Sequence, residues 1–170
     1  QKRDEPLNEL KKIDNNTWKG AYTVKIKNLG INSPYSDFSP MFHNGSDIVY
    51  SSAKDSSVLT TRKYRWTNQP FLDLYVSKRK NEEGDLSSPK KFSKNINTKY
   101  HEASLAFSPD QKTIYFTRNN YGKRLKRGKN GINHLKIYRS RFVSGAWTKG
   151  EELPFNSEDY STGHPAISKD

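Results

Sequence analysis

Short runs of alternating apolar and polar residues, separated by turn-forming residues, recur along this chain. In "YHEASLAFSPDQKTIYFT", residues 100–117, an apolar run precedes a Ser-Pro-Asp-Gln-Lys turn, which leads into a run of β-branched and aromatic residues. This alternation predicts a β-hairpin, because turn residues interrupt two strand-like patterns. Aromatic residues make up 12% of the chain, which also favours strands. We therefore expect an all-β fold.

The hairpin is one copy of a repeated unit. "YHEASLAF" at 100–107 matches "YSDFSPMF" at 35–42 and "YSTGHPAI" at 160–167. The same order of matches continues in "INSPY" and "INTKY" at 31–35 and 96–100, and in "LDLYVSKR" and "LKIYRSRF" at 72–79 and 135–142. A repeat of about 60 to 65 residues, with about four short antiparallel strands in each copy, is typical of β-propeller blades.

The repeat also divides the chain into regions. Residues 1–21 are expected to be an N-terminal arm or linker, and residues 22–170 an incomplete propeller. "YTVKIKNL" at 22–29 alternates well and is expected to be a strand that completes a preceding blade. The last residues align with the start of a hairpin turn, so we expect about two complete blades with parts of their neighbours, truncated at the C-terminus.

The repeat predicts which side chains form the core. The apolar positions of the aligned strands are expected to be buried between blades, since these positions alternate with polar ones. The predicted core residues are Phe42, Ile48, Tyr50, Leu74, Phe107, Ile114, Phe116 and Ile137.

"AFSPDQKTIYFT" resembles the PD40 repeat of TolB-like propellers, in which the turn is Ser-Pro-Asp-Gly-Lys; here Gln111 stands where Gly is usual. The wider pattern over residues 22–170 is similar to PD40-containing proteins of the OmpA family. The resemblance implies a periplasmic protein associated with the outer membrane and linked to peptidoglycan through a domain that this chain does not contain. Some such proteins are components of the type IX secretion and gliding apparatus.

Few residues suggest catalysis or metal binding. The chain has no Cys, so thiol chemistry and Cys-based metal sites are excluded. Four His residues show no metal-ligand spacing, and no nucleophile elbow or P-loop is present. Asp37 and Glu102 share one repeat position, which favours a structural hydrogen-bond acceptor over a catalytic pair. We expect no cofactor, no metal and no enzymatic activity.

The whole chain carries a net charge of +12 and has a mean hydropathy of −1.04. Much of the positive charge lies in two segments. Residues 54–70 hold four basic residues against one acidic residue, and residues 118–134 hold six and none. Both segments join the second and third strands of a unit, so they should emerge on the same face as 31–37 and 96–102. They predict a surface for an anionic partner. The candidate residues are Arg62, Lys63, Arg65, Trp66, Tyr121, Lys123, Arg124, Lys126, Arg127 and Lys129.

These observations together predict a non-enzymatic scaffold that presents loops to envelope proteins with acidic surfaces. Nucleic acid is not expected, because no motif of a nucleic-acid-binding domain occurs. Solvated loops with no binding role remain an alternative for the basic segments. Two other functions stay open: a propeller that gates the substrate of a hydrolase, and a glycan-binding module that uses aromatic residues such as Trp66 and Tyr64.

Overall fold

The computed structural model describes residues 26–54, 63–121 and 125–169, and these contain strands, turns and irregular connections but no helix. The predicted all-β fold is therefore confirmed for this part of the chain. None of these residues belongs to a helix able to cross a membrane. The predicted arm, 1–21, lies outside the described residues. Of the strand predicted at 22–29, residues 26–29 form no strand, and the others lie outside the described residues.

The first sheet is an antiparallel meander, in which each strand pairs with the next one of that sheet in sequence. Its strands, in the order β1-β2-β5-β6, are β1 (Asp37–His43), β2 (Asp47–Ser52), β5 (Asp73–Ser77) and β6 (Lys90–Lys91). A separate small hairpin, β3 (Lys63–Tyr64) and β4 (Gln69–Pro70), is inserted between β2 and β5.

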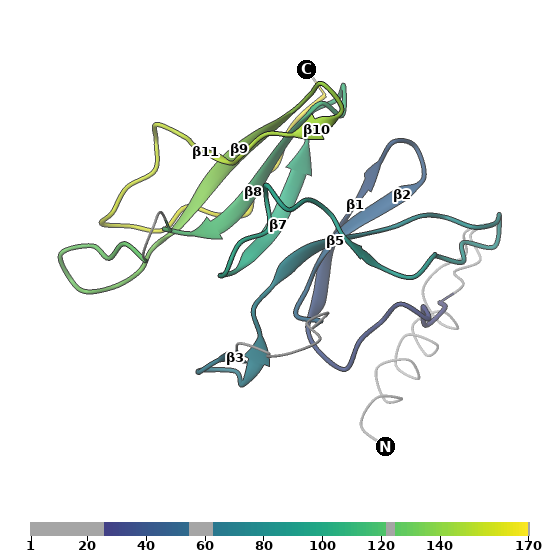
Figure 1. Cartoon of the computed structure of the whole chain (residues 1–170), viewed down its shortest axis with the longest axis horizontal. Helices are drawn as coiled ribbons and strands as arrows, with labels where there is room; N and C mark the ends of the chain where they lie inside the picture. The colour runs from purple at the N-terminus through teal and green to yellow at the C-terminus, as the bar shows by residue number, and fades with distance from the viewer. Residues whose placement is uncertain (1–25, 55–62, 122–124, 170) are drawn as a thin grey trace, which may run out of the picture.

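The second sheet repeats this arrangement. Its strands are β7 (Glu102–Phe107), β8 (Thr113–Asn119), β9 (Leu135–Val143), β10 (Ala146–Trp147) and β11 (Glu151–Glu152). Both β10 and β11 pair with β9 and together occupy the position of a fourth strand. The two sheets lie side by side, with β7 against β1 and β2 (Figure 1). Both sheets are open, and the described residues form no closed ring, so the predicted propeller is not observed as such.

The repeat extends to a local irregularity in the first strand of each unit. Phe42 pairs with Ile48 and Phe107 with Ile114, so the two hairpins have the predicted equivalent register. A β-bulge interrupts both β1 and β7, and the equivalent residues Ser39 and Ser104 have φ of 55° and 41°. His164, at the matching position of the third copy, has φ of 55°. Positive φ is uncommon outside glycine, so its recurrence marks a conserved backbone geometry within the chain.

The same hydrogen bond joins consecutive copies of the repeat. The backbone N–H of Ser104 donates to the Ser51 hydroxyl over 3.2 Å, and the N–H of His164 donates to the Thr117 hydroxyl over 2.9 Å. In each case the bulge residue of one copy contacts the second strand of the copy before it. The third copy therefore begins to pack on the second sheet in the way that the second sheet packs on the first.

An asparagine before each bulged strand anchors the connection to the preceding sheet. The Asn97 side chain accepts from the Leu74 N–H over 2.9 Å and donates to the Leu74 carbonyl over 3.0 Å. Asn156 makes the same pair of bonds with Ile137, at 3.0 and 2.7 Å. The Asn of the repeated "IN" or "FN" dipeptide is thus a two-bond link to the third strand. Asn32 is the first member of this series, and within the described residues its side chain bonds Asn28 and makes no such link to a third strand.

We expect Asn97→Ala to lower the free energy of unfolding by about 2 kcal/mol, because it leaves the Leu74 N–H without its acceptor. Chemical denaturation of the two proteins measures this difference. The matched control is Asn32→Ala, which removes an exposed side chain at the same repeat position and should change stability by less than about 0.5 kcal/mol. Equal losses in both variants would refute the link.

The core lies mainly between the two sheets. Val49 and Leu74 of the first sheet pack against Leu105, Phe107 and other residues of the second, and Ile114 and Phe116 are fully buried. A smaller cluster around Tyr50 covers the other face of the first sheet. The predictions for Tyr50, Leu74, Phe107, Ile114 and Phe116 are confirmed, whereas Ile48 and Ile137 are only half-buried.

Phe42 was predicted to be buried, and this is wrong. Its side chain is 69% exposed, whereas its equivalent, Phe107, is 6% exposed. Phe107 points at the first sheet and stacks on His43 with ring centroids 4.4 Å apart. Because side chains alternate along a strand, Phe42 next to His43 points away from the second sheet. Phe42 and Phe107 have the same register in their hairpins, but the described residues place a neighbouring sheet only against Phe107.

Candidate functional site

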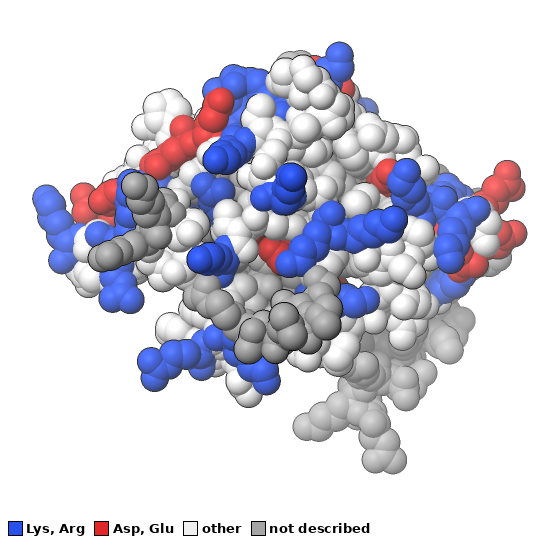
Figure 2. Space-filling model, in the orientation of Figure 1, with Lys and Arg blue, Asp and Glu red and all other residues white. Residues whose placement is uncertain are grey.

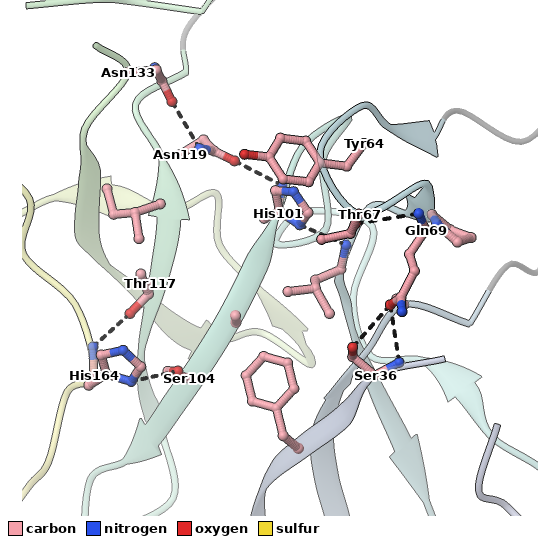
Figure 3. Close-up of a pocket in the computed structure, with 16 residues that line it drawn as sticks. Ser36, Tyr64, Thr67, Gln69, His101, Ser104, Thr117, Asn119, Asn133 and His164 are labelled. Atoms are coloured by element: carbon pink, nitrogen blue, oxygen red, sulfur yellow. Dashed lines mark hydrogen bonds between the residues drawn. The ribbon is translucent and has the colours of Figure 1, made fainter. Parts of the chain in front are cut away.

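A cavity of about 470 Å³ lies between the two sheets, where β2 and β8 end and β5 and β9 begin. We call it the inter-sheet cavity. Residues before β1 and β7 line it together with the segments inserted between the second and third strands of each sheet, as Figure 3 shows. The strand order predicted that these connections share one face, and the described residues confirm it. Its polar lining includes Ser36, Tyr64, Gln69, His101, Asn119 and Asn133.

The small hairpin β3–β4 forms one wall of the inter-sheet cavity. The Gln69 side-chain oxygen accepts from the backbone N–H and the hydroxyl of Ser36, at 3.3 and 3.0 Å. The Tyr64 ring contacts the edge of the His101 ring, with centroids 4.7 Å apart. These contacts hold the inserted hairpin against the first residues of both bulged strands, and a loop is thereby fixed on a rigid scaffold.

His101 is the residue of the inter-sheet cavity that departs from the repeat. Its Nδ1 accepts the Leu72 N–H over 3.1 Å, so the neutral ring carries its proton on Nε2. In the third copy, Ser161 occupies this position, and its hydroxyl accepts the equivalent Leu135 N–H over 3.1 Å. A serine therefore suffices for the structural bond. Burial lowers the pKa of His101 to about 4, so the ring is neutral at physiological pH.

Two asparagines extend the polar wall beyond His101. The Asn119 side-chain oxygen accepts a hydrogen bond from the backbone N–H of His101 over 3.2 Å. The side-chain amide of Asn119 donates to the side-chain oxygen of Asn133 over 2.9 Å. On the other side, the Ser104 hydroxyl and Nδ1 of His164 lie 3.0 Å apart (Figure 3). Among the described residues that line the inter-sheet cavity, none is Lys, Arg, Asp or Glu. A cavity of this composition suits hydrogen bonding and aromatic contact, and it offers no pair of carboxylates for acid–base chemistry.

Asp37 and Glu102 have the structural role that the repeat predicted. The Asp37 carboxylate accepts from the N–H and hydroxyl of Ser33, at 2.7 and 2.9 Å. Glu102 accepts from the N–H and hydroxyl of Thr98, at 2.9 and 2.6 Å. Each acid caps the turn before its strand. Over the described part of the chain, no group of three or more potential ligands is placed to hold a metal ion.

Those predicted basic residues that the structure describes do not line the inter-sheet cavity. Lys63, Arg65 and Trp66 are exposed on the β3–β4 hairpin, and the Trp66 side chain is 88% exposed. Tyr121 is half-buried, with its ring 4.8 Å from that of Tyr100. In the second segment Lys126, Arg127 and Lys129 are exposed, whereas Arg62, Lys123 and Arg124 lie outside the described residues. Figure 2 shows that Lys and Arg outnumber Asp and Glu on the visible face.

Sequence analysis did not identify Gln69, His101, Asn119 or Asn133 as site residues. One signal was present for His101, because Ser36 and Ser161 occupy the same repeat position. Gln69 and Asn133 have no such signal, since they lie in segments that differ in length between the copies, and Asn119 is the last residue of β8, aligned with Ala53 of the first copy.

Comparisons with protein-family models, with curated proteins and with solved structures give no match. What the structure defines is an all-β protein of repeated antiparallel sheets, with a cavity where the inserted segments of two sheets meet.

Proposed function

We propose that the chain is part of a β-propeller and serves as a non-enzymatic interaction module. The observation that carries this proposal is the convergence of the inserted segments of both sheets at one end, where exposed cations and aromatic rings surround the inter-sheet cavity. Binding residues are commonly placed on loops that a rigid scaffold holds. The partner we propose is an envelope protein with an acidic surface.

Two features support the propeller. The bond from a bulge residue to the preceding copy recurs at Ser104 and His164, so successive copies pack in one repeated way. The turn that resembles PD40 has Gln111 at φ 59°, a conformation that favours glycine. The Gln111 side chain bonds His43 over 3.0 Å, which gives a reason for glutamine here.

Through the resemblance to PD40-containing proteins of the OmpA family we propose a periplasmic location at the outer membrane, with peptidoglycan bound by a separate domain.

We expect replacement of Lys126, Arg127 and Lys129 by Ala to weaken capture of an acidic envelope partner several-fold at low salt. The effect should become smaller as the salt concentration rises, because salt screens the attraction between exposed charges. The measurement is quantitative pull-down from envelope extract. The matched control replaces the exposed residues Lys78, Lys80 and Lys112, an equal charge at the opposite ends of the strands. Equal recovery with both triple variants would leave the basic segments as solvated loops.

A carbohydrate-binding function is the second candidate, and the uncharged lining of the inter-sheet cavity favours it. In a chain of net charge +12, a cavity lined by amides, hydroxyls and a Tyr ring suits a neutral glycan. Capture that neither triple variant changes, but that a neutral oligosaccharide competes away, would support this candidate over the first.

A further inference from the structure

A second pocket, separate from the inter-sheet cavity, encloses about 340 Å³. Its residues come from the connection between β6 and β7, from the end of β8, and from the segment between β10 and β11. They are Lys94, Asn95, Asn97, Thr98, Arg118, Tyr121, Lys149 and Gly150. Three of these eight are cations and none is a carboxylate. We call it the Arg118 pocket.

Arg118 is buried, and no carboxylate among the described residues forms an ion pair with it. Its side chain is 7% exposed, and the guanidinium carbon lies 3.7 Å from the centroid of the Tyr138 ring. In the described part of the chain the guanidinium forms no hydrogen bond or ion pair, and its Nε is buried without a partner. Removing a cation from water is costly unless charge and hydrogen bonds compensate. The Tyr138 ring covers a face of the guanidinium and supplies only part of that compensation.

The acid nearest in the sheet does not neutralise Arg118. Glu102 is its direct cross-strand partner, yet the two form no ion pair within 4.0 Å. Both oxygens of the Glu102 carboxyl are engaged in hydrogen bonds with Thr98, one with its N–H and the other with its hydroxyl. Burial raises the pKa of Glu102 to about 8, so this group is mostly protonated at neutral pH. The positive charge of Arg118 is therefore available to a ligand.

The surroundings of Arg118 leave room for such a ligand and add charge to it. Lys94 and Lys149 are exposed at the rim, and neither forms an ion pair in the described part of the chain. The backbone of Gly150 passes so close that a Cβ there would lie 2.9 Å from the Phe116 ring and 3.3 Å from a guanidinium nitrogen of Arg118. A side chain at position 150 would therefore clash with the Phe116 ring and press on the guanidinium, and glycine leaves both in place.

We propose that the Arg118 pocket is a binding site for an oxyanion group, a carboxylate or a phosphate. The guanidinium of Arg118 donates two parallel N–H bonds to it, and Lys94 and Lys149 attract it at the rim. Guanidinium matches both groups through such paired donors. The site goes beyond the proposed function, because it depends on the buried Arg118 and on none of the exposed cations Lys126, Arg127 and Lys129, and because it fixes the chemistry of one recognised group.

The test titrates the chain with sodium phosphate and, in a second arm, with sodium acetate, at constant ionic strength and pH 7. Backbone amide NMR shifts report the binding. We expect saturable shifts at residues 94–98, 118–121 and 149–150. Arg118→Met, which keeps the packing on Tyr138, should weaken the affinity at least tenfold. Lys112→Met, at an exposed cation in the β7–β8 turn, should leave it unchanged.

Two further variants keep the test decisive if Arg118→Met fails to fold. Lys94→Gln with Lys149→Gln changes only exposed side chains and should weaken binding several-fold. Arg118→Lys keeps the charge and loses the paired donors, so its affinity should lie between those of wild type and Arg118→Met.

Saturation by phosphate alone, or by both ions, supports the site and identifies the group. Shifts that rise linearly without saturation, or equal affinities for the double-lysine variant and Lys112→Met, would overturn it. Partner capture measured in the earlier pull-down does not depend on this result.

Discussion

Phe107→Ala should lower the free energy of unfolding by about 3–5 kcal/mol. Phe107 contacts His43, Phe92 and Trp147, with ring centroids 4.4, 6.1 and 6.1 Å away, and these rings come from both sheets. Truncation removes a large buried apolar surface and leaves a cavity between the sheets that the surrounding rings fill only in part. Denaturant unfolding of the variant and wild type gives the difference.

Phe42→Ala is the matched control for this experiment. Phe42 has the same residue type at the same position of the repeat, but its side chain is 69% exposed. Its truncation should cost less than about 1 kcal/mol. If the two substitutions cost the same, the face of β1 that carries Phe42 is covered in solution, and the description of Phe42 as exposed is wrong.

The second large effect is a loss of stability that Glu102 causes as pH rises from about 4.5 to 8, measured as the difference between wild type and Glu102→Gln. The difference is needed because His101, whose pKa burial lowers to about 4, makes both proteins more stable as pH rises from about 4 to 6.5. Burial raises the pKa of Glu102 from 4.5 to about 8 in the folded chain. Between these values the folded state holds a proton that the unfolded state releases, so raising the pH favours unfolding. The loss reaches on the order of 4 kcal/mol at pH 8, from a cost of about 1.4 kcal/mol for each pH unit. Unfolding in denaturant at pH 5, 6, 7 and 8 measures it.

Glu102→Gln should remove this pH dependence. The amide imitates the protonated acid, because its oxygen accepts the Thr98 N–H while its nitrogen donates to the Thr98 hydroxyl. At pH 8 the variant should be more stable than wild type. Asp37→Asn alters the equivalent turn and should keep the slope. A stability difference between wild type and Glu102→Gln that is constant between pH 5 and 8 would show that Glu102 is ionised in the fold.

The repeat predicted local structure well because local structure depends on residues close in sequence. Matching "YSDFSPMF" with "YHEASLAF" was enough to predict the hairpin register and the turn-capping roles of Asp37 and Glu102. It failed for Phe42, because burial also depends on which surface lies opposite, and the described residues place nothing there that corresponds to the first sheet opposite Phe107.

The candidate sites were harder to predict for two physical reasons. The described cations of the predicted site are exposed to water, since Lys and Arg are strongly hydrated, and they do not line the inter-sheet cavity. Arg118 and His101 gain their properties from burial between elements distant in sequence. At His101 the departure from serine was visible, but its low pKa depends on rings contributed by the β3–β4 hairpin.

The hydrogen bond from each bulge residue to the hydroxyl of the copy before it determines how unfolding spreads through the molecule. It joins Ser104 to Ser51 and His164 to Thr117, so each copy is coupled to its sequence neighbour. In arrays of this kind, stability is approximately a sum of terms for single repeats and terms for their junctions. Loss of the Thr117 hydroxyl would therefore weaken the junction of the third copy, which Asn156 and Ser161 also hold, and leave the first junction unchanged.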